Sequence, residues 1–210
     1  MTTVNFKDLL EPFSPRLAQL GVDQAAVEKL AQYLDHLWSR NQDLNLVSRK
    51  LTPQQLVADH LMDSLIALPL LPDVARIVDL GTGGGFPAIP LAICRPKTTF
   101  LLFEKSPLKC KYLQELIEIA PNIEVKGMLG PYSITDDVDL VIARAFKPIG
   151  VILDMTRKYH ENKGRYFLYK ARLEKIREEL HLAGIKEKDV HIQALESAGD
   201  ADERHIVSIG

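Results

Sequence analysis

Residues 76–90 hold four glycines between two apolar runs, and this pattern constrains the fold more than any other in the chain. The glycines are Gly81, Gly83, Gly84 and Gly85. The run before them predicts a buried strand. The run after them predicts a helix, whose first turn tolerates proline because its N–H groups have no intrahelical partner. Glycine lets a ligand lie against the main chain, and a helix N-terminus offers N–H donors, so the segment predicts a nucleotide-type ligand.

One spacing of these glycines fits the dinucleotide fingerprint G-x-G-x-x-G/A, which residues 83–88 satisfy. Glu104 follows about twenty residues later, where that fingerprint has an acid. Counted from the first glycine of the turn, Gly81, the pattern fails because Phe86 stands where its final glycine should be. A nicotinamide- or flavin-dependent oxidoreductase therefore stays open as an alternative.

The other spacing, read outward from the strand, is acid-x-G-x-G-x-G. It runs through Asp79, Gly81, Thr82, Gly83 and Gly85. This pattern is similar to the first motif of class I S-adenosylmethionine methyltransferases, and we favour it. It implies S-adenosyl-L-methionine as the cofactor, with its methionyl end at the glycine turn and its ribose hydroxyls at an acid after the second strand. Glu104 ends the next strand-like run and is the expected acid.

Composition limits the class of protein. With 210 residues, 46% of them hydrophobic and 26% charged, the chain fits one α/β domain with room for an N-terminal extension. The formal net charge of -2 gives no overall attraction for polyanions, so an RNA surface must be a local basic patch. Cys94 and Cys110 are the two cysteines, which argues against a disulfide framework, and the scattered histidines predict no metal site. We expect no membrane span and no secretory leader, and therefore a cytoplasmic protein.

The first third of the chain predicts helices. A capping residue, Asp23, precedes apolar residues at helical spacing that continue to about residue 41. Thr52 and Pro53 begin a second helix, as a cap followed by proline at the first helical position. We therefore expect residues 1–72 to form a helical extension packed on a methyltransferase domain of residues 73–210.

Three polar residues lie within one turn of the second helix, namely His60, Asp63 and Ser64. Their spacing allows an internal hydrogen bond that positions the helix. The alternative is that they border the cofactor pocket, because the glycine strand follows shortly after them. Both interpretations stay open.

Strand-like and helix-like segments alternate from residue 75 onward, which predicts a mostly parallel sheet with helices on both faces. Later strands are expected at residues 98–103, 123–126, 138–143, 164–170, 190–194 and 204–209. The last two suggest the antiparallel pair that closes a Rossmann-like class I methyltransferase sheet. Glu104 and Arg144 stand at carboxyl ends of strands, where such sheets bind ligands. Arg144 could pair with a carboxylate such as Glu104, or contact the cofactor or an RNA phosphate.

Several motifs occur in order along nearly the whole chain. They are Asn45-Leu46, His60-x-x-Asp63-Ser64, the glycine motif continued by Phe86-Pro87-x-Ile89-Pro90, Ala143-Arg144-Ala145-Phe146, and residues 204–209. In this set the chain resembles the RsmG (GidB) family. The resemblance implies a cytoplasmic enzyme that transfers a methyl group from S-adenosylmethionine to N7 of a guanine in small-subunit (16S) ribosomal RNA. It places cofactor contacts on Gly81, Phe86 and Arg144, with a backbone contact near Leu129 and Gly130.

The chain departs from the family pattern at three positions. Ala88 and Ala171 replace usual glycines, and Pro131 stands where an acid is common. These departures leave open a non-catalytic ribosome-assembly factor with the same fold.

The implied chemistry needs no general base, because guanine N7 carries an exposed lone pair and no proton. Arg144, Lys170 and His60 are therefore candidates for positioning the substrate. RNA contacts are expected from basic clusters at Arg49 and Lys50; Lys105, Lys109 and Lys111; Arg144 and Lys147; and Arg165, Lys170 and Arg172. The expected partner is 16S RNA in the small ribosomal subunit or an assembly intermediate, and we favour a monomer.

Overall fold

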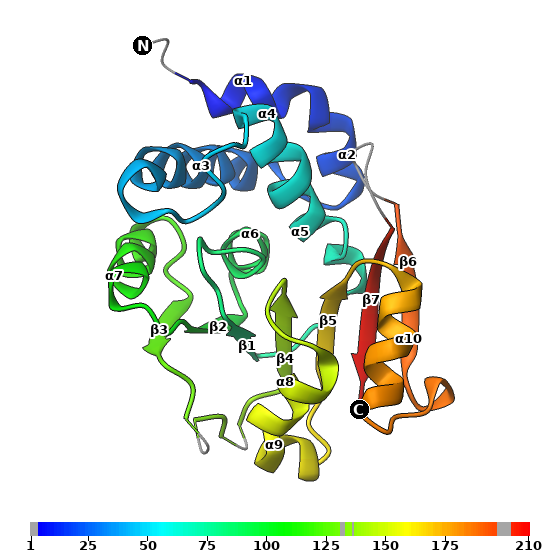
Figure 1. Ribbon diagram of the computed structural model, residues 1–210. Helices are drawn as coiled ribbons and strands as arrows, with labels where there is room; N and C mark the ends of the chain where they lie inside the picture. Colours follow the sequence, from blue (N-terminus) through cyan, green and yellow to red (C-terminus); the bar gives the residue numbers. More distant parts are fainter. Residues whose placement is uncertain (1–3, 131–132, 136, 197–202) are drawn as a thin grey trace.

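A computed structural model describes residues 4–130, 133–135, 137–196 and 203–210 (Figure 1). In these ranges the centre of the molecule is a seven-stranded sheet in the order β3-β2-β1-β4-β5-β7-β6. Its strands are β1 (Arg76–Leu80), β2 (Thr99–Phe103), β3 (Ile123–Gly127), β4 (Leu140–Arg144), β5 (Tyr166–Lys170), β6 (His191–Leu195) and β7 (Arg204–Ile209). Strands β1 to β5 pair in parallel, whereas β7 runs antiparallel to β5 and β6. The predicted Rossmann-like fold class is confirmed.

The strand order reverses at β1, which lies between β2 and β4. Within β1, Asp79 is in register with Leu102 of β2 and Ile142 of β4. Open α/β sheets bind ligands at the carboxyl ends of strands beside such a reversal. The glycine turn follows β1 directly, so the ligand-binding turn predicted from sequence lies at this crevice.

Helices cover both faces of the sheet (Figure 1). The α-helices are α1 (Phe6–Leu10), α2 (Ser14–Gln19), α3 (Gln24–Leu44), α4 (Pro53–Gln55), α5 (Asp63–Leu65), α6 (Ala88–Cys94), α7 (Pro107–Glu115), α8 (Ile149–Met155), α9 (Arg157–Glu161) and α10 (Leu173–Leu182). A π-helix, η2 (Leu56–Met62), and short 3-10 helices, η1 (Glu11–Phe13), η3 (Leu68–Leu70), η4 (Leu116–Glu118) and η5 (Glu187–Asp189), complete the set. Because side chains alternate across a strand, Ile77 packs in the core with α1, α3, α6 and α7, and Val78 packs in the core with α8, α9 and α10.

The N-terminal helices help to hold the glycine turn. Helix α3 begins after Asp23, whose carboxylate accepts a backbone N–H at 2.8 Å, as predicted. From α3, the Tyr33 hydroxyl donates to the carbonyl of Gly84 at 2.9 Å. The Tyr112 hydroxyl on α7 donates to the same carbonyl at 3.2 Å. Two helices thus fix one buried carbonyl of the turn from separate parts of the chain.

Two strands begin later than the apolar pattern predicts. Strand β4 starts late because Val138 donates its N–H to the carbonyl of Thr135 in a turn, at 3.2 Å. Strand β5 starts late because Gly164 donates its N–H to the carbonyl of Tyr159, at 2.8 Å. In both cases a local turn takes the backbone groups that a longer strand would need.

Candidate functional site

The glycine turn joins β1 to α6 through left-handed backbone. Gly81 and Gly85 have φ angles of 72° and 109°, which residues with a Cβ rarely adopt. A Cβ on Gly85 would lie 2.7 Å from Cγ1 of Ile89, and a Cβ on Gly81 would lie 2.3 Å from Cδ2 of Phe146. The N–H of Gly81 also donates to the carbonyl of Phe103 at 2.8 Å, which fixes the turn against β2. Both positions therefore require glycine for conformation and for space.

Glu104 stands at the carboxyl end of β2 and binds the backbone of the glycine turn. Its Oε2 accepts the N–H of Gly83 at 3.0 Å, and its Oε1 accepts the N–H of Ser106 at 2.8 Å. The residue is 8% exposed. An ionised carboxylate has about four lone-pair sites, so these two bonds leave acceptor capacity for further donors such as hydroxyl groups.

Asp79 lies beneath the turn and is fully buried. Neither carboxylate oxygen has a hydrogen-bond partner among the described residues. The pKa of Asp79 is raised to about 7, mainly by burial; the Thr82 side chain and the charge of Arg144 oppose the rise, and the charge of Glu104 adds to it. A buried carboxylate without partners destabilises a fold, and a cationic ligand group beside it would offset that cost. The open backbone of the glycine turn next to the Asp79 carboxylate therefore fits the amino-acid end of S-adenosylmethionine.

Arg144, the last residue of β4, reaches into the layer of N-terminal helices. Its Nη1 donates to the carbonyl of His60 at 2.8 Å and to Oγ of Ser64 at 3.0 Å. Its Nη2 donates to Nδ1 of His60 at 2.9 Å and to the carbonyl of Asp59 at 3.4 Å. Nη1 also lies 3.5 Å from Oδ2 of Asp63. These contacts satisfy a guanidinium that is almost withdrawn from water.

Asp63 connects Arg144 with a second arginine. Its Oδ1 accepts from Nε of Arg204 at 2.7 Å. The side chains of Arg144 and Asp63 are only 12% and 11% exposed. Burial lowers the pKa of Arg144, and the charge of Asp63 opposes that shift. Of the partners left open for Arg144, a carboxylate is present, but it is Asp63 and not Glu104, because the arginine turns toward α5 rather than along the sheet edge.

His60 takes part as a neutral acceptor. Burial lowers its pKa to about 4, and the charges of Arg144 and Arg204 add to this effect. Because a guanidinium only donates, Nδ1 of His60 accepts from Arg144. The Phe86 ring closes the group, with its centroid 5.3 Å from that of His60 and 5.6 Å from Cζ of Arg144. His60 and Phe86, both predicted site residues, are thus brought together with Arg144.

The carbonyls that bind Arg144 belong to the π-helix η2. The sequence predicts an uninterrupted helix from Thr52, and the predicted cap is present, because Thr52 and Gln55 form a capping box. The helix then widens at Leu56–Met62. Asp59 and His60 within it present carbonyls to the guanidinium. Such widened turns frequently mark functional sites. The internal hydrogen bond is present, because Oγ of Ser64 donates to the carbonyl of His60 at 2.6 Å. His60 and Asp63 also border the hollow described next, and their place beside the cofactor stays a prediction.

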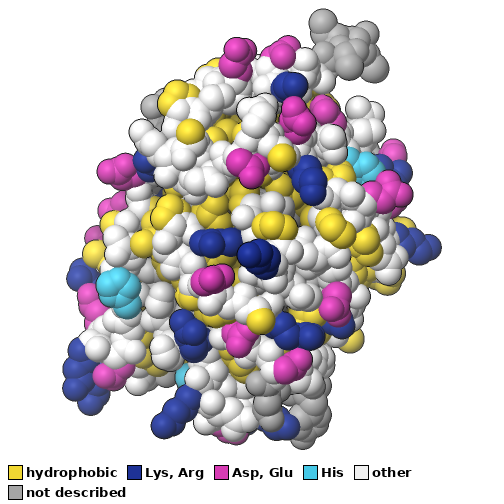
Figure 2. Space-filling view, turned by 180° about the vertical axis from the view of Figure 1, so that it is seen from behind, with side chains coloured by type: hydrophobic (Ala, Val, Ile, Leu, Met, Phe, Trp, Pro, Cys, Tyr) yellow, Lys and Arg dark blue, Asp and Glu magenta, His cyan; other side chains and the backbone are white. Residues whose placement is uncertain are grey.

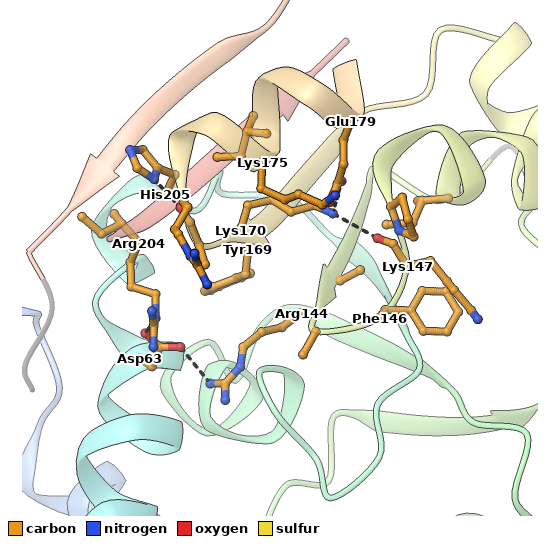
Figure 3. Close-up of a pocket in the computed structure, with 18 of the residues that line it drawn as sticks. Asp63, Arg144, Phe146, Lys147, Tyr169, Lys170, Lys175, Glu179, Arg204 and His205 are labelled. Atoms are coloured by element: carbon orange, nitrogen blue, oxygen red, sulfur yellow. Dashed lines mark hydrogen bonds and ion pairs between the residues drawn. The ribbon is translucent and has the colours of Figure 1, made fainter. Parts of the chain in front are cut away.

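A hollow of about 1010 Å³ opens beyond the carboxyl ends of β4 and β5 and the start of β7 (Figure 3). Its lining includes Asp63, Arg144, Phe146, Lys147, Tyr169, Lys170, Lys175, Glu179, Arg204 and His205. Gly81 and Glu104 are not part of this lining. The glycine turn and the hollow meet at the segment after β4, since Phe146 both covers Gly81 and lines the hollow.

Lys170 lines the hollow but is held by protein groups. Its Nζ lies 2.6 Å from Oε2 of Glu179 and donates to the carbonyl of Lys147 at 3.0 Å. Oε2 of Glu179 also accepts the N–H of Ile149 at 2.8 Å. The side chains of Lys170 and Glu179 are 13% and 11% exposed. The pair therefore fixes the segment between β4 and α8, a role that sequence spacing did not indicate.

The predicted basic clusters separate in space. Lys147, Lys170 and Arg172 line the hollow with Arg144, whereas Arg165 precedes β5 and lies at the opposite edge of the sheet. Arg165 therefore does not cluster in space with Lys170 and Arg172, with which the sequence grouped it. On the face turned away in Figure 1, basic and acidic side chains intersperse among the residues that the structure describes (Figure 2). A continuous basic surface is not present on that described face.

Two further predicted residues follow β3. Leu129 packs against the core that includes Val78 and helices α8, α9 and α10, and the N–H of Gly130 donates to Oγ of Ser133 at 2.7 Å. Pro131, one of the departures from the family pattern, lies outside the described residues. Within the described ranges, no group of His, Cys, Asp and Glu side chains could hold a metal ion, and no helix is long and apolar enough to cross a membrane.

Comparison with known proteins gives a consistent result. A model of the GidB family, rRNA small subunit methyltransferase G, matches residues 26–207. Ribosomal RNA small subunit methyltransferase G 1 of Bdellovibrio bacteriovorus is 44% identical over 198 residues, which cover 93% of this chain and 96% of that protein. Ribosomal RNA small subunit methyltransferase G of Brachyspira hyodysenteriae is 33% identical over 208 residues, which cover 98% and 100%. The solved fibrillarin of Aeropyrum pernix with natively bound S-adenosyl-L-methionine shares the fold, with a TM-score of 0.52 and 17% identity over 71% of this chain and 74% of that one.

The buried Asp79 predicts a specific dependence of stability on pH. Its pKa is raised from 3.8 to about 7, so the folded chain holds this proton more tightly than the unfolded chain. Its contribution to the free energy of unfolding is therefore greatest below pH 3.8 and falls as the pH rises toward about 7. Asp79→Asn removes that decline. Denaturant unfolding of both proteins across this range measures it, and equal pH slopes would contradict the assignment.

Proposed function

This chain belongs to the GidB family of rRNA small subunit methyltransferases, and from that premise we propose that it methylates N7 of a guanine in 16S ribosomal RNA. The proposal rests on one observation: the glycine turn and the hollow lie next to each other at the segment that follows β4. The glycine turn, with the unpaired Asp79 below it, adjoins a hollow of about 1010 Å³ through Arg144 and Phe146. A methyl donor in the turn would face an RNA base in the hollow.

The cofactor of this family fold is S-adenosyl-L-methionine, and the residues of the turn fit it. When bound, it supplies a methyl group on a positively charged sulfur, and transfer to N7 leaves the electron pair of the broken C–S bond on sulfur and the positive charge on the purine. Asp79 would face the amino group, and the free acceptor positions of Glu104 would take ribose hydroxyls. Gly81, Phe86 and Arg144 would border the methionyl end, and Leu129 and Gly130 the adenine.

The residues around the base have positioning roles. Guanine N7 has no proton to lose, so no general base is required. The state of His60 is consistent with this, because its pKa of about 4 and its hydrogen bond to Arg144 make it a neutral acceptor and not a general base. Holding the two reactants in line at near-attack distance is then the main contribution of the protein. Arg144 and the segment after it would border both reactants, and we assign this positioning role to them.

The RNA partner would be held by charge at the rim of the hollow. Lys147 and Arg172 are exposed there, and phosphate neutralisation supplies much of the affinity of such proteins. An unpaired base can then enter the hollow, as is usual in RNA recognition. We propose the small ribosomal subunit or its assembly intermediate as the substrate, the cytoplasm as the place of reaction, and a monomer as the active form, because one chain carries both the turn and the hollow.

Methyl transfer tests the proposal directly. The protein is incubated with unmodified small ribosomal subunits and methyl-labelled S-adenosylmethionine, and the digested RNA is analysed for 7-methylguanosine. Label in that nucleoside is the expected result. Tight cofactor binding without transfer to subunits or to their assembly intermediates would favour a non-catalytic assembly factor, and label in another nucleoside would overturn the N7 assignment.

Gly81→Val is expected to abolish cofactor binding, because its Cβ would overlap the Phe146 ring and a β-branched residue is strained at a φ of 72°. Gly21→Val is the matched control, since Gly21 has a φ of 78° and no atom within 4 Å of a built Cβ. Titration calorimetry with S-adenosylmethionine compares the two. Equal affinities would place the cofactor away from the turn.

A further inference from the structure

Phe146 occupies the border between the glycine turn and the hollow. A Cβ built on Gly81 would lie 2.3 Å from Cδ2 and 2.7 Å from Cε2 of its ring, so the ring lies directly against the turn. Phe146 is also one of the residues that line the hollow, at the segment after β4 (Figure 3), and it is half-buried. A base that enters the hollow and approaches the turn therefore reaches this ring.

The chain holds the Phe146 segment on both sides. Before it, Arg144 is anchored in the helix layer, and Ala145 has a φ of 50°, a left-handed conformation that alanine rarely adopts. After it, the carbonyl of Lys147 accepts from Lys170, and the N–H of Ile149 donates to Glu179. The ring is thus carried by a short segment whose two ends are fixed by buried groups.

Tyr169 also lines the hollow, but its ring is less exposed to an incoming base. Tyr169 is 7% exposed, and its hydroxyl donates to the carbonyl of Ser64 at 3.1 Å. Burial raises its pKa far above the usual range, so it stays a neutral phenol. Tyr169 forms the back wall, whereas Phe146 offers a ring to an incoming base.

We propose, on the basis of the function proposed above, that Phe146 is the platform on which the target guanine stacks, and that its ring stabilises the positive charge that methylation creates on the purine. Unpaired bases stack on aromatic side chains in single-stranded RNA recognition. During transfer the N7 lone pair forms the new N–C bond, the C–S pair stays on sulfur, and the purine becomes cationic. The face of a phenyl ring attracts a cation, so this contact strengthens as the reaction proceeds and lowers the barrier.

Three replacements of Phe146 separate this role from a packing role. Phe146→Leu removes the ring, Phe146→Trp keeps a stronger π face, and pentafluorophenylalanine keeps the shape but reverses the electrostatics of the ring face. Phe13→Leu is the matched control, because Phe13 lies on η1 and does not line the hollow. The readouts are kcat and KM for small subunits, the affinity for S-adenosylmethionine, and the affinity ratio of 7-methylguanosine monophosphate to guanosine monophosphate at mildly acidic pH.

The expected result is a fall in kcat of roughly tenfold to a hundredfold for the leucine and pentafluoro variants, with activity kept by the tryptophan variant. In the leucine and pentafluoro variants, the affinity ratio of 7-methylguanosine monophosphate to guanosine monophosphate also falls. An unchanged kcat in the pentafluoro variant would overturn the proposal. Tighter cofactor binding by Phe146→Leu, with kcat maintained, would also overturn it and make the ring a cover of the turn. Failure of wild-type protein to methylate would instead reject the proposed function.

Discussion

The site depends on a guanidinium that has been taken out of water. Arg144 ends a central strand, yet its side chain is satisfied by two carbonyls of η2, by Ser64, by the imidazole of His60 and by Asp63. A buried charge is tolerated only when its partners are this complete. The carbonyls of the widened helix, the neutral histidine and the carboxylate shared with Arg204 meet that requirement, and together they tie the N-terminal helices to the sheet edge.

Sequence reasoning succeeded where physical rules act locally. The glycine spacing predicted the turn. At Gly81 the backbone has a positive φ angle, and the ring of Phe146 lies so close that a Cβ would overlap it. The parallel alternation predicted that Glu104 and Arg144 would share one edge, because carboxyl ends of parallel strands meet there. The strand starts were less accurate, since turn bonds at Thr135 and Tyr159 compete with the sheet for the same backbone groups.

The contacts that build the site could not be read from spacing. Arg144 and Asp63 are far apart in sequence, and Glu104 was the carboxylate that the sheet edge suggested as a partner for Arg144. Within the π-helix, Asp59 and His60 present carbonyls to that distant arginine, a contact that spacing along the helix does not reveal. Lys170 carried a basic pattern but is neutralised by Glu179. The division into an extension of residues 1–72 and a domain of residues 73–210 stays a prediction.

The central claim is that Asp63 and Arg144 act as one unit that shapes the cofactor site. Titration of S-adenosylmethionine into Asp63→Asn tests it most directly, with Asp59→Asn as control, because Asp59 contributes only its backbone carbonyl to Arg144. The account predicts that Asp63→Asn weakens binding by about tenfold or more while Asp59→Asn binds as the wild type does. Equal, undiminished affinity in both folded variants would contradict it.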